Sequence, residues 1–207
     1  MSEATPVLSR IFQKRITNEI KLMQKDPLEW IDILPKEDDI RQWYFLIRGP
    51  AETDYYGGVY IGKLQLSDNY PITPVDFYML TPNGRFETDK KICLTISGYH
   101  PDSWSAMWNI QKILGAFLSV MTSDLDSGIS HIRSSQTERK KYAEESFNFN
   151  FCKYKDIFTN FNRFIKVNAD GTFSVKTDEE VRAEMPKPKE KKKKDEPSID
   201  LGSIKLS

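Results

Sequence analysis

Cys93 and His100 are the two residues whose types and spacing most directly suggest chemistry. They lie in the stretch KKICLTISGYHPDSWSAMW, residues 90–108. A cysteine thiolate is a good nucleophile and a tolerable leaving group, which is what the relay of an acyl group requires. An imidazole titrates near neutral pH and can take up a proton from an attacking group. This stretch could therefore hold a nucleophile and its base.

Both residues also have a structural interpretation. A cysteine within an apolar run such as KICLTI is commonly a small buried hydrophobe. The His100-Pro101-Asp102 tripeptide is typical of a turn in which Asp102 caps the segment that starts at Ser103. The position of Cys93, after a loop with Pro and Gly and before a helix, favours the nucleophile, because a thiol there can face solvent. Cys152, in an aromatic helical stretch, is expected to be a filler.

The elements that must position these residues follow from hydrophobic periodicity. Four strands are predicted in succession, without a helix between them, at residues 30–34, 42–48, 59–66 and 75–80. They indicate an antiparallel meander with one face covered. Amphipathic patterns predict helices at residues 5–25, 109–122, 135–149 and 151–166. The fold class is therefore α+β: an N-terminal helix, a four-stranded antiparallel meander, a long loop at residues 81–108, a central helix and two C-terminal helices.

The chain divides into one folded domain and a tail. Residues 5–166 carry the apolar patterns and form the predicted domain. Residues 167–207 are polar and rich in lysine, a composition typical of disorder. A lysine cluster can attract anionic lipid or act as a nuclear address, but a solvated tail is the main interpretation.

Composition excludes several classes of function. Thirty basic and thirty acidic side chains cancel, so no global field favours nucleic acid, and none is expected as a partner. No stretch approaches the length of apolar sequence that a membrane span needs. Two distant cysteines and no signal peptide fit a reducing compartment, which predicts a cytoplasmic location. The two cysteines and two histidines lack the short spacings of a structural zinc site.

A set of motifs in fixed order carries a family resemblance. The stretch YYGGVYIGKLQLSDNYPITPVDFYMLTPNGRF, residues 55–86, is followed by ICLTIS, HPDSW and a further Trp. This resembles the ubiquitin-conjugating enzyme family over residues 14–149. It is most similar to the membrane-associated branch linked to degradation of proteins at the endoplasmic reticulum. That branch has Thr-Pro-Asn-Gly-Arg-Phe, here Thr81 to Phe86, in place of a His-Pro-Asn tripeptide, and a His-Pro-Asp-x-Trp segment, here His100 to Trp104.

The resemblance implies an activity for Cys93. It would accept the C-terminus of ubiquitin as a thioester from an activating enzyme and pass it to a substrate protein, with a ligase holding both partners. ATP is consumed upstream by the activating enzyme, so no metal or nucleotide cofactor is expected here. Two alternatives remain open: a catalytically weak family member that acts as a ubiquitin-pathway binding scaffold, and a cysteine hydrolase built on Cys93 and His100.

The resemblance also implies helpers for the cysteine. The family gives the tripeptide asparagine, here Asn83, an oxyanion-stabilising or loop-bracing role. Asn83 lies ten residues before Cys93, whereas the common spacing is eight, and Asn83-Gly84 is also a plain turn signal. His100 is a candidate base or a turn residue. Asp126, with Asp124 beside it, lies near the position where relatives orient an incoming lysine, but solvated carboxylates are the ordinary interpretation.

Partner contacts follow from the same resemblance. Family members meet the activating enzyme and the ligase through the first helix and two loops. The matching residues here are Lys14, Arg15, Ile72, Ala106 and Met107. Lys14 and Arg15 have an alternative interpretation as solvated charges, whereas an exposed Ile72 would indicate a partner. Relatives in this branch end in a membrane anchor, whereas this sequence ends in polar residues. The resemblance to the branch makes the cytosolic face of the endoplasmic reticulum a second expected location.

Overall fold

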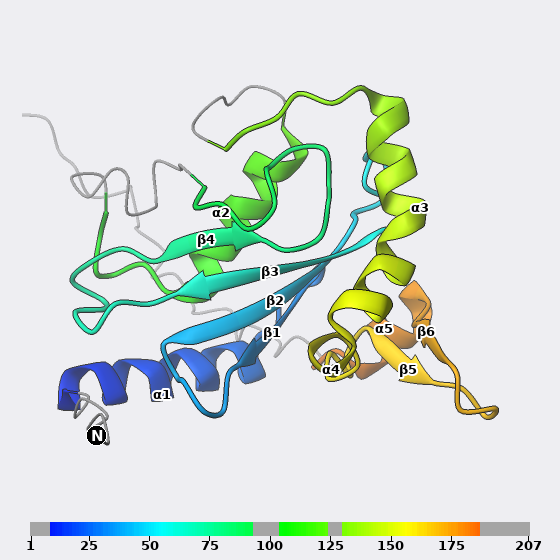
Figure 1. Cartoon of the computed structure of the whole chain (residues 1–207). Helices are drawn as coiled ribbons and strands as arrows, with labels where there is room; N and C mark the ends of the chain where they lie inside the picture. The colour runs from blue at the N-terminus through cyan, green and yellow to red at the C-terminus, as the bar shows by residue number, and fades with distance from the viewer. Residues whose placement is uncertain (1–8, 93–103, 124–129, 187–207) are drawn as a thin grey trace, which may run out of the picture.

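The structure is a computed structural model that describes residues 9–92, 104–123 and 130–186. Its centre is a four-stranded antiparallel sheet, seen edge to edge in Figure 1. The strands follow one another in chain order: β1 (Ile31–Pro35), β2 (Gln42–Arg48), β3 (Val59–Gln65) and β4 (Asp76–Met79). The predicted meander and its α+β class are confirmed.

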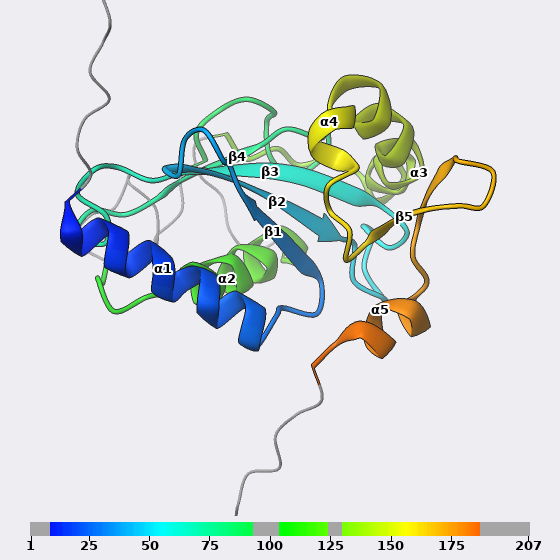
Figure 2. The ribbon, with the colours of Figure 1, turned by 90° about the horizontal axis from the view of Figure 1, so that it is seen from below.

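Two helices cover one face of this sheet. They are α1 (Arg10–Lys25) and α2 (Ile110–Thr122), which Figure 2 shows together on one side. The Ser9 side chain caps α1 and the Asn109 side chain caps α2, each accepting an N–H of the first turn. Phe117 of α2 is central to this core, because its ring lies 5.0 Å from Phe77 and 5.2 Å from Phe86.

The C-terminal part of the chain covers the opposite face. It comprises α3 (Gln136–Lys153), α4 (Lys155–Phe158), the hairpin of β5 (Ile165–Val167) and β6 (Phe173–Val175), and α5 (Asp178–Glu184). A second apolar core lies between these elements and the sheet; its buried members include Leu46, Ile61, Phe158, Phe161, Phe164 and Val181. The sheet is therefore buried on both faces, and not on the single face that its sequence predicts.

The predicted helix at residues 151–166 is wrong. α3 runs on to Lys153, α4 makes one turn, and the chain then enters β5. Phe158, Phe161 and Phe164 are all fully buried in the second core, so tertiary packing fixes their positions. Asn160 lies between them and its side chain donates to the carbonyl of Asp156, an interaction that competes with a continuing helix.

The predicted domain boundary at residue 166 is also too early. It falls inside β5, and residues 173–184 form β6 and α5. A capping box formed by Thr177 and Glu180 starts α5, and Val181 is buried against the second core. The folded unit therefore includes residues 167–184, while residues 187–207 lie outside the described part. Within the described ranges, no helix combines the length and apolar character needed to cross a membrane.

Candidate functional site

Three of the predicted site residues lie outside the described residues. These are Cys93, His100 and Asp126. The structure does describe the segments beside them in the sequence: residues 81–92, which lead to Cys93, residues 104–109, and residues 130–134, which follow the loop with Asp126. The frame of the site is therefore built from these three segments.

Asn83 is buried, and its side chain organises its own turn. The Nδ2 group donates to the carbonyl oxygens of Thr81 at 2.9 Å and Phe86 at 3.4 Å. The Oδ1 atom accepts the N–H groups of Arg85 at 2.9 Å and Phe86 at 2.8 Å. An amide has two donor hydrogens and two acceptor lone pairs, so all four are used within the turn. This arrangement favours the loop-bracing role of Asn83 over the oxyanion role.

Thr81 attaches this turn to the sheet and to α3. Its hydroxyl accepts the N–H of Ile61 at 2.9 Å and donates to Oδ1 of Asn150. Asn150 in turn donates to the carbonyl of Val59 at 2.8 Å, and Ser146 accepts the N–H of Val59 at 2.9 Å. These buried polar groups satisfy one another, which is the condition under which such a network rigidifies a structure. Thr81 thus anchors the motif that carries Asn83.

Residues 130–134 run beside residues 84–91 and hold them in register. The N–H of Glu87 donates to the carbonyl of Ser130 at 2.9 Å, and the Ser130 hydroxyl donates to the carbonyl of Lys91 at 3.0 Å. The N–H of Ile132 donates to the carbonyl of Arg85 at 2.9 Å. Ser130 has a φ of 68°, in the left-handed region that non-glycine residues rarely adopt. These bonds end at Lys91, two residues before Cys93.

Arg85 and His131 form a side-chain pair between residues 84–91 and residues 130–134. The sequence interpretation missed this pair. Arg85 is buried, and its Nη1 lies 3.2 Å from Nδ1 of His131. The His131 ring meets the Phe86 ring edge-on at 5.0 Å. A guanidinium only donates, so Nδ1 of His131 acts as the acceptor in this contact. No local pattern in the sequence marks this pair, because the two segments are far apart along the chain.

An open hollow of about 380 Å³ borders the Asn83 turn, with Ile132 and Tyr142 on its far side. Its lining is mixed apolar and polar, and it includes Glu87, whose carboxylate pairs with Lys90. Among the residues that the structure describes, no three His, Cys, Asp or Glu side chains are grouped so that they could hold a metal ion.

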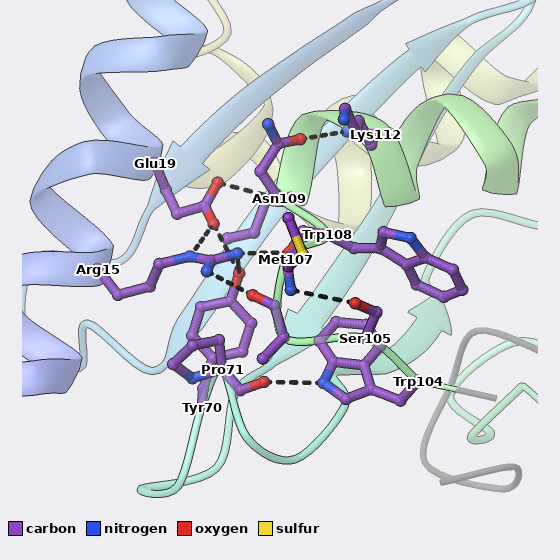
Figure 3. A network of polar contacts seen from close by, with 12 residues as sticks. Arg15, Glu19, Tyr70, Pro71, Trp104, Ser105, Met107, Trp108, Asn109 and Lys112 are labelled. Atoms are coloured by element: carbon purple, nitrogen blue, oxygen red, sulfur yellow. Dashed lines mark hydrogen bonds and ion pairs between the residues drawn. The ribbon is translucent and has the colours of Figure 1, made fainter. Parts of the chain in front are cut away.

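Among the predicted partner residues, Arg15 contacts the loop of Ala106 and Met107, and the loop of Ile72 adjoins it. Ile72 is 73% exposed and Met107 is 88% exposed, and Ala106 and Lys14 are exposed as well. Trp104 links the two loops, since its Nε1 donates to the carbonyl of Pro71 at 2.8 Å (Figure 3). We call Lys14, Ile72, Ala106 and Met107 the docking surface. Ile72 and Met107 therefore place two apolar side chains in solvent on neighbouring loops.

Arg15 differs from the other predicted partner residues because its guanidinium is engaged internally. Nε donates to Glu19 at 2.6 Å and Nη1 donates to the carbonyl of Ala106 at 2.7 Å, and Nη2 donates to the carbonyl of Trp108. Burial disfavours the charge of Arg15, but the hydrogen bond and charge of Glu19 outweigh this, so the pKa of Arg15 is raised. Lys14 is therefore the exposed cation of the pair.

Curated relatives align over the same region of the chain. The sequence is 43% identical over 138 residues to ubiquitin-conjugating enzyme E2 6 of Eremothecium gossypii, which covers 67% of this chain and 57% of that protein. It is 42% identical over 133 residues to ubiquitin-conjugating enzyme E2 32 of Arabidopsis thaliana, covering 64% and 43%. A ubiquitin-conjugating enzyme E2 J2-like protein of Dictyostelium discoideum is 41% identical over 144 residues, covering 67% and 84%.

The chain spans about half the length of the first two relatives. The family model described as ubiquitin-conjugating enzyme matches residues 15–150, which contain the sheet, α2, most of α1 and the frame around Cys93. These are close to the bounds that the sequence motifs predict. The chain therefore belongs to the ubiquitin-conjugating enzyme family.

Proposed function

We propose that this protein accepts ubiquitin as a thioester on Cys93 and transfers it to side chains of substrate proteins together with a ligase. One observation carries the proposal: in a chain of this family, Cys93 directly follows a segment that the structure holds in register on two sides. Thr81 ties the start of that segment to β3 and α3, and Ser130 ties its end at Lys91. A segment attached in this way immediately before Cys93 in the sequence supports a role of that residue as the nucleophile.

The reaction is two successive acyl transfers. The Cys93 thiolate attacks the carbonyl carbon of the ubiquitin thioester on the activating enzyme, and the thiolate of that enzyme leaves. An acceptor amine or hydroxyl then attacks the new thioester, loses its proton, and the Cys93 thiolate leaves. We assign Asn83 a loop-ordering role in both steps, because its amide is already used within its turn. His100 and Asp126 remain candidates for handling the acceptor proton.

The docking surface suggests how the partners bind. We assign it to the activating enzyme and the ligase, which in this family must bind in turn. Ile72 and Met107 supply exposed apolar area, and Lys14, exposed on α1, supplies a positive charge. Exposed apolar anchors of this kind, surrounded by polar groups, are typical of protein interfaces.

We also infer a place of action at the cytosolic face of the endoplasmic reticulum. The support is the resemblance of residues 81–86 and 100–104 to the membrane-associated branch, together with the similarity to several relatives named E2 6. Fractionation of cells that express the full-length protein, with markers for cytosol and reticulum membranes, tests this assignment.

A thioester assay tests the main proposal. The protein is incubated with ubiquitin, activating enzyme and ATP, and a ubiquitin adduct that a thiol reductant removes is expected. Cys93→Ala should abolish the adduct. Cys152→Ala is the matched control, because Cys152 is a free and exposed thiol on α3, and it should leave the adduct unchanged. No adduct on the wild-type protein would contradict the proposal and leave only a binding role.

A discharge assay then identifies the acceptor. The purified thioester is mixed with free lysine, serine or threonine, and loss of the adduct is followed over time. Discharge onto lysine alone indicates ordinary amide formation, while discharge onto serine or threonine indicates ester formation. Discharge that is no faster than hydrolysis with any of these acceptors would count against transfer without a ligase.

A further inference from the structure

Glu19 is a charged side chain of α1 that is buried inside the protein. It is 1% exposed, although it lies on the surface helix that carries Lys14. Its Oε1 accepts from Nε of Arg15 at 2.6 Å and from the Tyr70 hydroxyl at 2.8 Å. Its Oε2 accepts the N–H of Ile110, the first residue of α2, at 3.0 Å (Figure 3). A carboxylate is well placed there, because a helix N-terminus attracts negative charge.

Through Arg15 this carboxylate is connected to the loop that carries Ala106 and Met107. The Arg15 guanidinium is held at Nε by Glu19, and its two terminal nitrogens then point at the carbonyl groups of Ala106 and Trp108. The planar guanidinium has its donors in a fixed fork, so fixing one donor sets the direction of the others. The backbone on both sides of Met107 is thereby attached to α1.

Through Tyr70 the same carboxylate reaches the loop that carries Ile72. The Tyr70 hydroxyl donates to Glu19, and the Tyr70 ring lies below the Arg15 guanidinium, 5.3 Å from its carbon to the ring centre. Burial raises the pKa of Tyr70, and the neighbouring charge of Glu19 raises it further, so the hydroxyl stays a donor. Trp104 joins the two loops directly, because it donates to the carbonyl of Pro71, which precedes Ile72.

Stability alone is a poor explanation for this arrangement. A buried ion pair contributes little net stability, because removing both charges from water costs about as much as their attraction returns. Apolar side chains of similar size could fill the space that Arg15 and Glu19 occupy beside Tyr70. Apolar side chains could not, however, form the hydrogen bonds that Arg15 and Glu19 make to two loop carbonyl groups and a helix N–H.

We propose that Glu19 is a positioning residue for the docking surface: through Arg15 and Tyr70 it sets the relative placement of the Ile72 loop and the Ala106–Met107 loop. The inference rests on the proposed function, because it assumes that these loops meet the activating enzyme and the ligase. The placement of the loops themselves can be measured independently of that function.

The test compares Glu19→Gln with a matched control. Glu145→Gln is the same substitution in an exposed pair of the same i, i+4 spacing, with Lys141 of α3, and should change nothing. Two quantities are measured: hydrogen exchange of the peptides that contain residues 70–73 and 104–110, and the KM of the activating enzyme for this protein. In Glu19→Gln we expect faster exchange in both peptides and a KM raised about tenfold, with kcat at saturation unchanged.

Folding is checked separately, because this protein is the varied substrate of the activating enzyme and an unfolded fraction would raise its apparent KM while kcat stayed the same. Urea denaturation of Glu19→Gln should show that the variant is almost fully folded under the assay conditions, so that a tenfold rise in KM reports weakened binding by misplaced loops. The double variant Arg15→Met/Glu19→Gln sharpens this further, because it leaves no unpaired buried charge. Its stability should exceed that of Glu19→Gln, while its KM should stay high.

Each outcome has a distinct meaning. Unchanged exchange in Glu19→Gln, or a double variant with wild-type KM, would overturn the proposal. If Ile72→Ala leaves the KM unchanged, the docking surface is assigned wrongly and so is the role of Glu19 in it. If the wild-type protein forms no adduct, the proposed function fails, yet faster exchange in both peptides of Glu19→Gln would still support Glu19 as the group that positions the two loops.

Discussion

Ser130 combines an unusual backbone conformation with hydrogen bonds to the site. It is buried, has a φ of 68°, and makes bonds in two directions to the segment that leads to Cys93. A serine in the left-handed region costs more than a glycine would, because its Cβ crowds the backbone. The hydroxyl bond to the Lys91 carbonyl is the compensating contact.

A pair of substitutions separates these two contributions. Ser130→Ala removes the hydroxyl and keeps the strain, so it should destabilise the protein by about 1 kcal/mol or more. Ser130→Gly also removes the hydroxyl but relieves the strain, so it should be about 1 kcal/mol more stable than the alanine variant. Urea denaturation measures both. An alanine variant as stable as the glycine variant would show that the backbone is not strained at this position.

At this scale, sequence patterns could find some site residues and not others. Glu19 has a usable signal, since it lies three residues after Ile16 within the buried stripe of a helix, where a charge needs partners. Ser130 and Arg85 have none, because their partners come from distant segments. The motif predicts a site role for Asn83, but only the coordinates show that its amide makes all of its hydrogen bonds within its own turn.

At the scale of elements, the edge strand β1 carries a carboxylate whose pKa departs from its ordinary value. Asp32 lines a cavity of about 340 Å³ between the end of α1, β1 and the end of α5, with Arg163 beside it. Burial raises the pKa of Asp32, and the N–H of Ile33 and the charge of Arg163 only partly oppose this. The folded protein therefore holds this proton more tightly than the unfolded chain does.

The sign of the pH dependence follows from that shift. Stability should fall as pH rises from the ordinary pKa of an aspartate, about 3.9, through the raised value in the folded state. Asp32→Asn should have a higher Tm than the wild-type protein at pH 7, and the difference should vanish at pH 3. Asp38→Asn, an exposed carboxylate on the following turn, is the control and should shift Tm little. A lower Tm for Asp32→Asn at pH 7 would contradict the assigned sign.

Elements with strong local patterns are the ones that the sequence located well. The predicted strand at residues 42–48 matches β2, and the predicted helix at 109–122 differs from α2 only at its capping residue. The chain after α3 was misjudged because its phenylalanines recur at helical spacing, while their burial is set by the outer face of the sheet. Periodicity reports which residues are buried, but not always which element buries them.

At the scale of the whole molecule, the sheet is shared between two cores with different residues. The first contains α1 and α2 and the frame of the site, and the second is closed by the C-terminal elements (Figure 2). The family match ends at residue 150, whereas the second core depends on Phe158, Phe164 and Val181. The segment that follows the family domain is therefore part of the fold on which the site is built.

Truncation measures that dependence. We compare a chain that ends at Pro186 with one that ends at Asn168, which lacks β6 and α5. The shorter chain loses the partner strand of β5, the buried Val181 and the ion pair of Asp178 with Arg48. It should lose several kcal/mol, a large part of an ordinary domain's stability of about 5–15 kcal/mol. Val181→Ala in the longer chain should cost about 1–3 kcal/mol by the same burial argument.

The denaturation slope shows whether the loss is local or global. If residues 169–186 unfold together with the sheet, the shorter chain exposes less surface on unfolding, so its m-value in urea should fall together with its midpoint. An unchanged midpoint and slope would mean that β6 and α5 rest on the domain without stabilising it. The shorter chain could also have a lower urea midpoint and yet form the thioester at the normal rate under native conditions. That result would show that the second core stabilises the sheet without shaping the site. It is the result we expect, because the frame from Thr81 to Lys91 contacts α2 and α3 instead.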